Sequence, residues 1–163
     1  MPRQGLGAEN PINDRAQVVF VLVFLIIWGI DSFLLRFGLN QLGLISLLVS
    51  VPIGVISFII GVYFVRKSEA VVFSNTEGKV IDTGVYGWVR HPMYFGELLI
   101  LLGFSIATLS ILSFVVWIVF FIFIDRMASY EEKDLTRILG QQYVDYQNKV
   151  HKWIPYKRYK QEK

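Results

Sequence analysis

Long apolar runs alternate with short polar segments along the chain, and this pattern predicts membrane-spanning helices. Residues 18–35 form the first run and residues 42–65 the second; as helices, both are of the length needed to cross a hydrocarbon core of ~30 Å. Residues 95–124 form a third run that would be ~45 Å long as one helix. A break near residues 108–110 divides it into two shorter helices, so we expect a hairpin there.

The distribution of basic residues supports this hairpin. Four basic residues precede the third run, from Arg66 to Arg90, and nine follow it within residues 126–163. Because segments rich in Lys and Arg stay on the cytoplasmic side, both flanks are predicted to be cytosolic, and the chain must cross and return. Arg3 and Arg15 place the start of the chain on the same side. We therefore predict an all-α integral membrane protein with four transmembrane helices and both termini cytoplasmic, in the plasma membrane of a prokaryote or the endoplasmic reticulum of a eukaryote.

Composition fits one compact membrane domain over residues 1–163, with 54% hydrophobic residues. Its predicted parts are a cytosolic segment (1–17), two transmembrane helices (18–65), a cytosolic loop (66–91), the hairpin (92–125) and a cytosolic region with further helices (126–163). The absence of cysteine excludes thiolate chemistry, and the two histidines lie on separate segments, so no metal site is predicted. The net charge of +3 fits topology and anionic headgroups, not nucleic-acid binding.

Two segments carry more local detail. Small residues recur on one face of the second helix and predict close packing against another helix; they are Ser46, Ser50, Gly54, Ser57 and Gly61. In the following loop, residues 70–81 are predicted to form a strand, a turn and a strand that cover a site at the membrane surface. Pro92 then suits the first position of the third helix.

The last long helix is predicted to run past the membrane and to stop near Gly140. Glu132 shares a partly apolar face with Ala128 and Leu135, so its side chain is expected to point inward. Tyr143 and Tyr146 are predicted to be packing or interfacial residues and not ligands. Trp153 is predicted to anchor the chain at the membrane surface.

Four motifs in register are decisive. They are Gly84-Val85-Tyr86, Arg90-His91-Pro92 with Tyr94, Glu131-Glu132, and the segment Gly140-Gln141-Gln142-Tyr143-Val144-Asp145-Tyr146. Together they resemble the isoprenylcysteine carboxyl methyltransferase family, whose architecture the phospholipid N-methyltransferases share. The resemblance covers residues 79–156, about half of the chain. The eukaryotic members carry additional N-terminal spans, and residues 70–74 lack the polar cofactor contacts that the family leads us to expect.

The resemblance implies a membrane methyltransferase that uses S-adenosylmethionine at the cytosolic surface, with a lipid or a prenylated small molecule or protein as acceptor. By matching positions, the residues implied to bind the cofactor are Lys79, Val80, Ile81, Tyr86, His91, Pro92, Met93, Tyr94, Glu131 and Glu132. The candidate catalytic residues are Arg126, Arg90 and Glu97; Glu97 is included because an ionisable side chain one turn into the membrane is costly and so suggests a role. Arg126 is the nearest candidate to receive a substrate carboxylate.

Other interpretations remain open for several of these residues. One alternative is that His91 only caps the helix that begins at Pro92, and another is that the Glu97 side chain reaches back to the membrane interface. Asp31 is predicted to be structural, with Arg36 as partner. For the whole chain, the alternatives to methylation of a prenylcysteine-like carboxylate are N-methylation of an aminophospholipid, a non-enzymatic membrane adaptor, and a sterol-type reductase with a nicotinamide cofactor.

Overall fold

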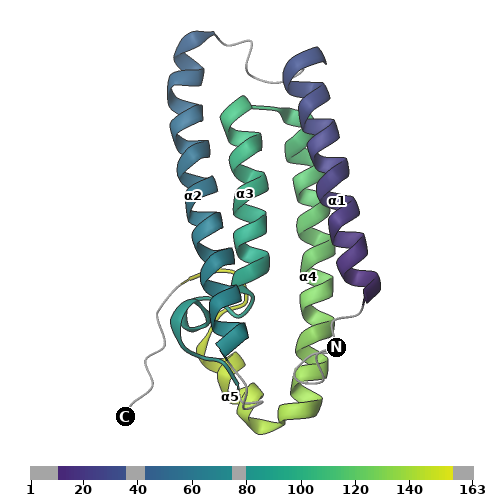
Figure 1. Ribbon diagram of the computed structural model, residues 1–163, viewed down its shortest axis with the longest axis vertical. Coiled ribbons are helices and arrows are strands. Elements are labelled where there is room, and N and C mark those ends of the chain that lie inside the picture. The colour runs from purple at the N-terminus through teal and green to yellow at the C-terminus, as the bar shows by residue number, and fades with distance from the viewer. Residues whose placement is uncertain (1–10, 36–42, 75–79, 156–163) are drawn as a thin grey trace.

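The computed structural model describes residues 11–35, 43–74 and 80–155. In these ranges every regular element is a helix (Figure 1). Four long helices run side by side in alternating directions, and the last short helix and the loop before the third long helix lie together at one end of the bundle. The all-helical prediction is confirmed.

The elements follow one another in a simple order. Helix α1 (Pro11–Gly29) continues as a π-helical segment, η1 (Ile30–Leu35), and α2 (Leu44–Ser74) follows. A short 3₁₀ turn, η3 (Gly84–Gly87), leads into α3 (Pro92–Thr108). Helix α4 (Ile111–Leu139) and the short α5 (Gln141–Lys149) complete the fold.

Among the described residues, three helical segments are long and apolar enough to cross a membrane. They are Arg15–Leu35, Leu44–Ala70 and Ile111–Leu139. Helix α3 is apolar but has only 17 residues, about 26 Å of helix. The chain is therefore built as a membrane protein, while a fourth span through α3 stays a prediction.

The predicted break in the third apolar run is confirmed. Helix α3 ends at Thr108 and α4 begins at Ile111. Leu109 turns the chain with φ 51°, a left-handed conformation that is uncommon for a residue other than glycine. Ser110 then caps α4 by accepting a hydrogen bond from the Ser113 amide at 3.2 Å. This turn brings the start of α3 and the end of α4 to the same end of the bundle (Figure 1).

The strand predicted to begin at residue 70 is wrong, because α2 continues as a helix to Ser74. The β-branched pair Val71-Val72 suggested a strand, but β propensity depends strongly on context. A helix that already exists gains one hydrogen bond for each residue added, and no proline or glycine interrupts it between Gly61 and Ser74. The second predicted strand does not form at residues 80–81, which have no regular structure. The turn predicted between them lies largely outside the described residues.

The small-residue face of α2 packs against α3, as predicted. A Cβ atom added at Gly54 would lie 2.5 Å from the Gly103 carbonyl oxygen, and one added at Gly61 would lie 2.5 Å from that of Gly96. The two backbones thus meet without side chains between them. The seam is reinforced by Ser57 Oγ, which donates to a carbonyl oxygen of α3, that of Leu99, at 2.8 Å.

A buried carboxylate stabilises the end of the bundle where α3 turns into α4. Asp31 lies in η1 and has no exposed surface. It accepts hydrogen bonds from the Ser110 hydroxyl and, at 3.2 Å, from the Leu112 amide. Asp31 therefore stabilises the first turn of α4 from a neighbouring helix, in keeping with its predicted structural role. Its predicted partner Arg36 lies outside the described residues.

Candidate active site

The site lies where the loop before α3 meets the end of α4, and the loop is firmly anchored there. Val85 and Val89 are buried against Phe64 of α2. The Tyr86 hydroxyl lies 2.9 Å from Ser68 Oγ of the same helix, and the Tyr86 carbonyl accepts a hydrogen bond from Tyr146 Oη at 2.7 Å. Burial raises the pKa of Tyr86, so this phenol stays neutral at physiological pH.

Helix α3 begins directly after this loop. Pro92 occupies its first turn and is fully buried, as the sequence predicts. His91 stands at the N-cap position, but its side chain makes no capping hydrogen bond. The alternative interpretation of His91 as a helix cap is therefore wrong. Its imidazole points instead toward α4.

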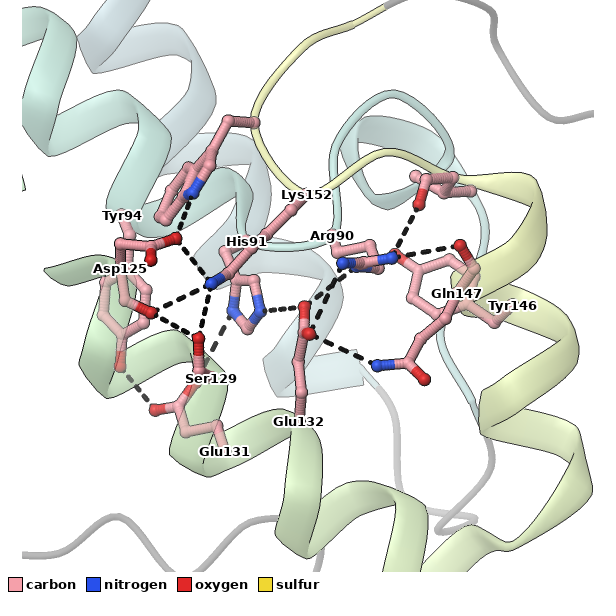
Figure 2. A network of polar contacts seen from close by, with 12 residues as sticks. Arg90, His91, Tyr94, Asp125, Ser129, Glu131, Glu132, Tyr146, Gln147 and Lys152 are labelled. Atoms are coloured by element: carbon pink, nitrogen blue, oxygen red, sulfur yellow. Dashed lines mark hydrogen bonds and ion pairs between the residues drawn. The ribbon is translucent and has the colours of Figure 1, made fainter.

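Three polar residues of α4 form a stripe on the face that meets the loop. Asp125, Ser129 and Glu132 are spaced four and three residues apart, so they lie on one side of the helix. Figure 2 shows all three pointing into the same polar network. The predicted inward orientation of Glu132 is confirmed, since its side chain is only 13% exposed.

Glu132 is the centre of that network. Its Oε1 accepts hydrogen bonds from Arg90 Nε at 2.9 Å and from His91 Nε2 at 3.0 Å. Its Oε2 accepts from Gln147 Nε2 at 3.2 Å and from Arg90 Nη2 at 3.4 Å. An ionised carboxylate only accepts hydrogen bonds, so His91 carries a proton on Nε2.

Glu131 lies beside the other ring nitrogen of His91. Its Oε2 lies 3.6 Å from His91 Nδ1, and its Oε1 accepts a hydrogen bond from the Tyr94 hydroxyl. The rings of His91 and Tyr94 stack with centroids 5.8 Å apart. The two glutamates of the motif therefore enclose the histidine, and Glu131 is the more exposed of them, at 30%.

The return segment, residues 150–155, covers the network. The Arg90 amide donates to the His151 carbonyl at 3.0 Å, and Arg90 Nη1 donates to the carbonyls of Gln147 and Val150 at 3.0 and 3.2 Å. Arg90 thus binds the end of α5 and the return segment as well as Glu132. A planar guanidinium with five N–H donors is suited to serve several acceptors at once.

Comparison with known proteins identifies the family. Residues 42–142 match the sequence pattern described as phospholipid methyltransferase. The chain belongs to this family.

The chain is also similar to individual proteins whose names agree with the family resemblance of its motifs. The chain is 37% identical over 78 residues to protein-S-isoprenylcysteine O-methyltransferase of Saccharomyces cerevisiae, covering 47% of this chain and 33% of the relative. It is 35% identical over 79 residues to a probable protein-S-isoprenylcysteine O-methyltransferase of Oryza sativa subsp. indica, covering 48% and 41%. The chain thus matches only a third to two fifths of the length of these relatives. The resemblance to the isoprenylcysteine methyltransferases is confirmed.

Within this family fold, the predicted site residues separate into two groups. Arg90, His91, Tyr94, Glu131 and Glu132 form one connected network, and Pro92 and Met93 open the helix that carries part of it. The other predicted residues lie around this network or away from it, and their roles stay predictions.

Of this second group, Val80 packs against the buried cluster of Tyr143, Tyr146 and Val150, and Tyr86 lies beside it. Ile81 is half-buried, and Lys79 lies outside the described residues. Arg126 is exposed on α4. Glu97 is half-buried in α3 and accepts a hydrogen bond from Gln17 of α1.

The sequence interpretation missed four members of the network. Asp125, Ser129, Gln147 and Lys152 were not singled out, although the spacing of Asp125, Ser129 and Glu132 is visible in the sequence. Trp153 was predicted to anchor the chain at the membrane surface. This role stays a prediction; in the structure its indole N–H donates to Asp125 Oδ1 at 2.7 Å, and its ring lies 5.7 Å from that of Phe121.

Proposed function

We propose that this protein transfers a methyl group from S-adenosylmethionine to the carboxylate of a prenylated cysteine or a similar lipid-like acid, at the cytosolic surface of a membrane. The observation that carries the proposal is the contact of His91 with Glu132, which joins the two motifs of the family resemblance in one site. The names of the relatives support the reaction and the acceptor.

The charges of the site fit the proposed methyl donor. Three carboxylates, those of Asp125, Glu131 and Glu132, face two permanent cations, Arg90 and Lys152. Three negative and two positive charges leave a net charge of −1 when His91 is neutral. S-adenosylmethionine carries a sulfonium, an ammonium and a carboxylate, a net charge of +1, so the site complements it.

The start of α3 offers a second point of fit. The first amides of a helix have no partner within the helix and attract anions. Pro92 lacks an amide, and the Phe95 amide already bonds the His91 carbonyl at 2.9 Å. The amides of Met93 and Tyr94 are therefore the ones suited to hold a carboxylate. Glu131, beside Tyr94, is suited to the ammonium group.

The proposed reaction requires little acid–base chemistry from the protein. The bound donor supplies a methyl group already activated by its sulfonium. A carboxylate acceptor is ionised at neutral pH, so no residue has to remove a proton. The protein must align the two reactants and exclude water, which can contribute about 7–11 kcal/mol to lowering the barrier. The rigid loop, held by Ser68, Tyr146 and Glu132, is suited to this task.

N-methylation of an aminophospholipid is the second candidate, because the family description names phospholipids. An ammonium acceptor must lose a proton before it can attack. His91 Nδ1 is the atom of the network suited to take it, because Nε2 already donates to Glu132. Glu97, one turn into α3, is the other candidate base.

One assay separates the candidates. Purified protein in vesicles is supplied with S-adenosylmethionine labelled on the methyl group and with either a prenylcysteine or an aminophospholipid. We expect label in a base-labile ester of the prenylcysteine. Label in the phospholipid would instead support N-methylation. Absence of any saturable donor binding by calorimetry would support a non-enzymatic adaptor and overturn both.

A further inference from the structure

A cluster of polar contacts joins the return segment to α4 beside the proposed site. The Asp125 cluster consists of Asp125, Ser129, Lys152 and Trp153, and Figure 2 shows the Lys152 side chain reaching down onto α4. Lys152 Nζ donates to the Asp125 carbonyl at 2.9 Å, to Asp125 Oδ1 at 2.6 Å and to Ser129 Oγ at 2.8 Å. Three acceptors take up the three N–H donors of the ammonium group.

This saturation decides what Lys152 can do. An ammonium group with all three donors occupied would have to break a bond within the protein to receive a carboxylate of a substrate. Lys152 is also largely buried, with 17% of its side chain exposed. Its geometry therefore suits holding two parts of the protein together, and not binding a ligand.

Trp153 connects the Asp125 cluster to His91. Its indole N–H donates to the same Asp125 Oδ1 that Lys152 binds. Its ring lies 6.0 Å from the imidazole of His91 and packs against the core of the bundle. On its other side His91 contacts Glu131 and Glu132. The imidazole is thus held between the two glutamates and the return segment.

A second attachment lies at the other end of the return segment. The Arg90 amide, next to His91 in the chain, donates to the His151 carbonyl at 3.0 Å. Residues 151–153 are therefore fixed to the loop through Arg90 and to α4 through Asp125. A shift of the return segment would move both the backbone at Arg90 and the wall beside His91.

We propose that Lys152 is a positioning residue of the site: by binding Asp125 and Ser129 it holds the return segment and Trp153 against His91, and thereby sets the orientation of the imidazole toward Glu132. This inference rests on the proposed function for its effect on the methyl donor. The attachment itself is a property of the folded chain with no donor bound.

The test compares Lys152→Met with Lys149→Met in full-length protein. Both changes remove one positive charge from the same part of the chain, but Lys149 is exposed. For Lys152→Met we expect the Kd for S-adenosylmethionine, measured by calorimetry well below Tm, to rise about tenfold, as for the loss of roughly one charge-assisted hydrogen bond. We expect hydrogen exchange of the Arg90 amide, measured by NMR without donor, to become faster. Lys149→Met should change neither quantity.

Two further variants guard against a change that merely destabilises the protein. Trp153→Phe keeps a ring but removes the N–H donor to Asp125, and we expect it to raise the Kd about threefold. Lys152→Arg keeps the charge, and we expect it to restore most of the donor affinity. If Lys152→Met fails to fold, the Trp153→Phe result decides.

The outcomes distinguish the two proposals. A wild-type Kd in Lys152→Met or in Trp153→Phe, or a lower Tm without a change in Kd, would overturn the positioning role. Equal effects of Lys152→Met and Lys149→Met would overturn it as well. If wild-type protein binds no donor, the proposed function fails, while unchanged Arg90 exchange in Lys152→Met would independently show that the attachment has no influence on the loop.

Discussion

His91 Nε2 lies 3.0 Å from Glu132 Oε1, although 41 residues separate them in the chain. The hairpin of α3 and α4 produces this contact, since His91 precedes α3 and Glu132 lies on the last part of α4. The two residues are held as a pair by Arg90 and Gln147, which bind the same carboxylate. A site assembled from two ends of one hairpin depends on the packing of that hairpin as much as on its own side chains.

The first prediction concerns this pair. We expect His91→Ala and Glu132→Gln each to weaken binding of S-adenosylmethionine about tenfold to a hundredfold, as for the loss of a hydrogen bond to a charged group. Calorimetric titration of purified protein measures the effect. Asp134→Asn is the matched control, because Asp134 lies on the same helix but is exposed and pairs with Arg137. If all three variants bind S-adenosylmethionine with the same affinity, His91 and Glu132 are not part of a donor site.

The second prediction is that lysine does not replace Arg90. The Arg90 guanidinium serves Glu132, Gln147 and Val150 from one planar group, which an ammonium group cannot reproduce. We expect Arg90→Lys to lower the free energy of unfolding by about 2 kcal/mol, since buried acceptors lose their donors. Denaturation in detergent, compared with Lys133→Arg at an exposed position of α4, measures it. Wild-type stability in Arg90→Lys would contradict this account.

The third prediction concerns the seam between α2 and α3. We expect Gly54→Ala to lower stability by about 1–3 kcal/mol, because the added Cβ would lie 2.5 Å from the backbone oxygen of Gly103 and force the helices apart. Gly29→Ala is the control, since a Cβ there meets nothing within 4 Å. Thermal unfolding in detergent compares the two. An equal effect of the two substitutions would argue against the seam.

The fourth prediction concerns the turn at the opposite end of the hairpin. We expect Asp31→Ala to cost about 1–3 kcal/mol, because the Ser110 hydroxyl and the Leu112 amide lose a buried acceptor. Asp31→Asn keeps one carbonyl acceptor and should cost less. The free energies of unfolding of both variants, measured in detergent, show which substitution costs more stability. A larger loss in Asp31→Asn than in Asp31→Ala would contradict a purely capping role.

The fifth prediction is a loss of stability at alkaline pH. Burial raises the pKa of Tyr143 and Tyr146 above the ordinary tyrosine value of about 10. The folded state favours the neutral phenols, so their stabilisation is complete below pH 10 and decreases as the pH rises further, by up to about 1.4 kcal/mol per pH unit for each residue. Tyr143→Phe removes one of these titrations and leaves those of Tyr146 and of Tyr86, whose pKa burial also raises. Its stability should therefore decline less steeply above pH 10 than that of the wild type, and an unchanged slope would contradict the prediction.

Much of the fold could be predicted because it depends on local patterns. Apolar runs, the break at residues 108–110 and the small residues facing α3 are properties of neighbouring positions; the helices, the break and the packing were confirmed, while the fourth span stays a prediction. The orientation of Glu132 followed from its helical face in the same way. The strand at residue 70 failed because the local preference of Val71 and Val72 was overridden by the helix that precedes them.

The part of the site that the sequence did not predict depends on long-range geometry. Lys152 and Asp125 are 27 residues apart, and they meet only because the chain reverses after α4. That reversal occurs at Gly140, which has φ 59° in the left-handed region that glycine adopts easily. The sequence indicated a helix end near Gly140, but not the direction in which α5 would return. The contact of Trp153 with Asp125 could not be predicted for the same reason, while its role as a membrane-interface anchor stays a prediction.

The glycine seam also restricts the routes open to the lipid-like acceptor that we propose. Between α2 and α3 the backbones approach so closely at Gly54 and Gly61 that even a methyl group has no room. No acyl or prenyl chain can slide through that side of the bundle. If the proposed lipid-like acceptor enters from the bilayer, it would therefore have to pass by a side of the bundle other than this seam.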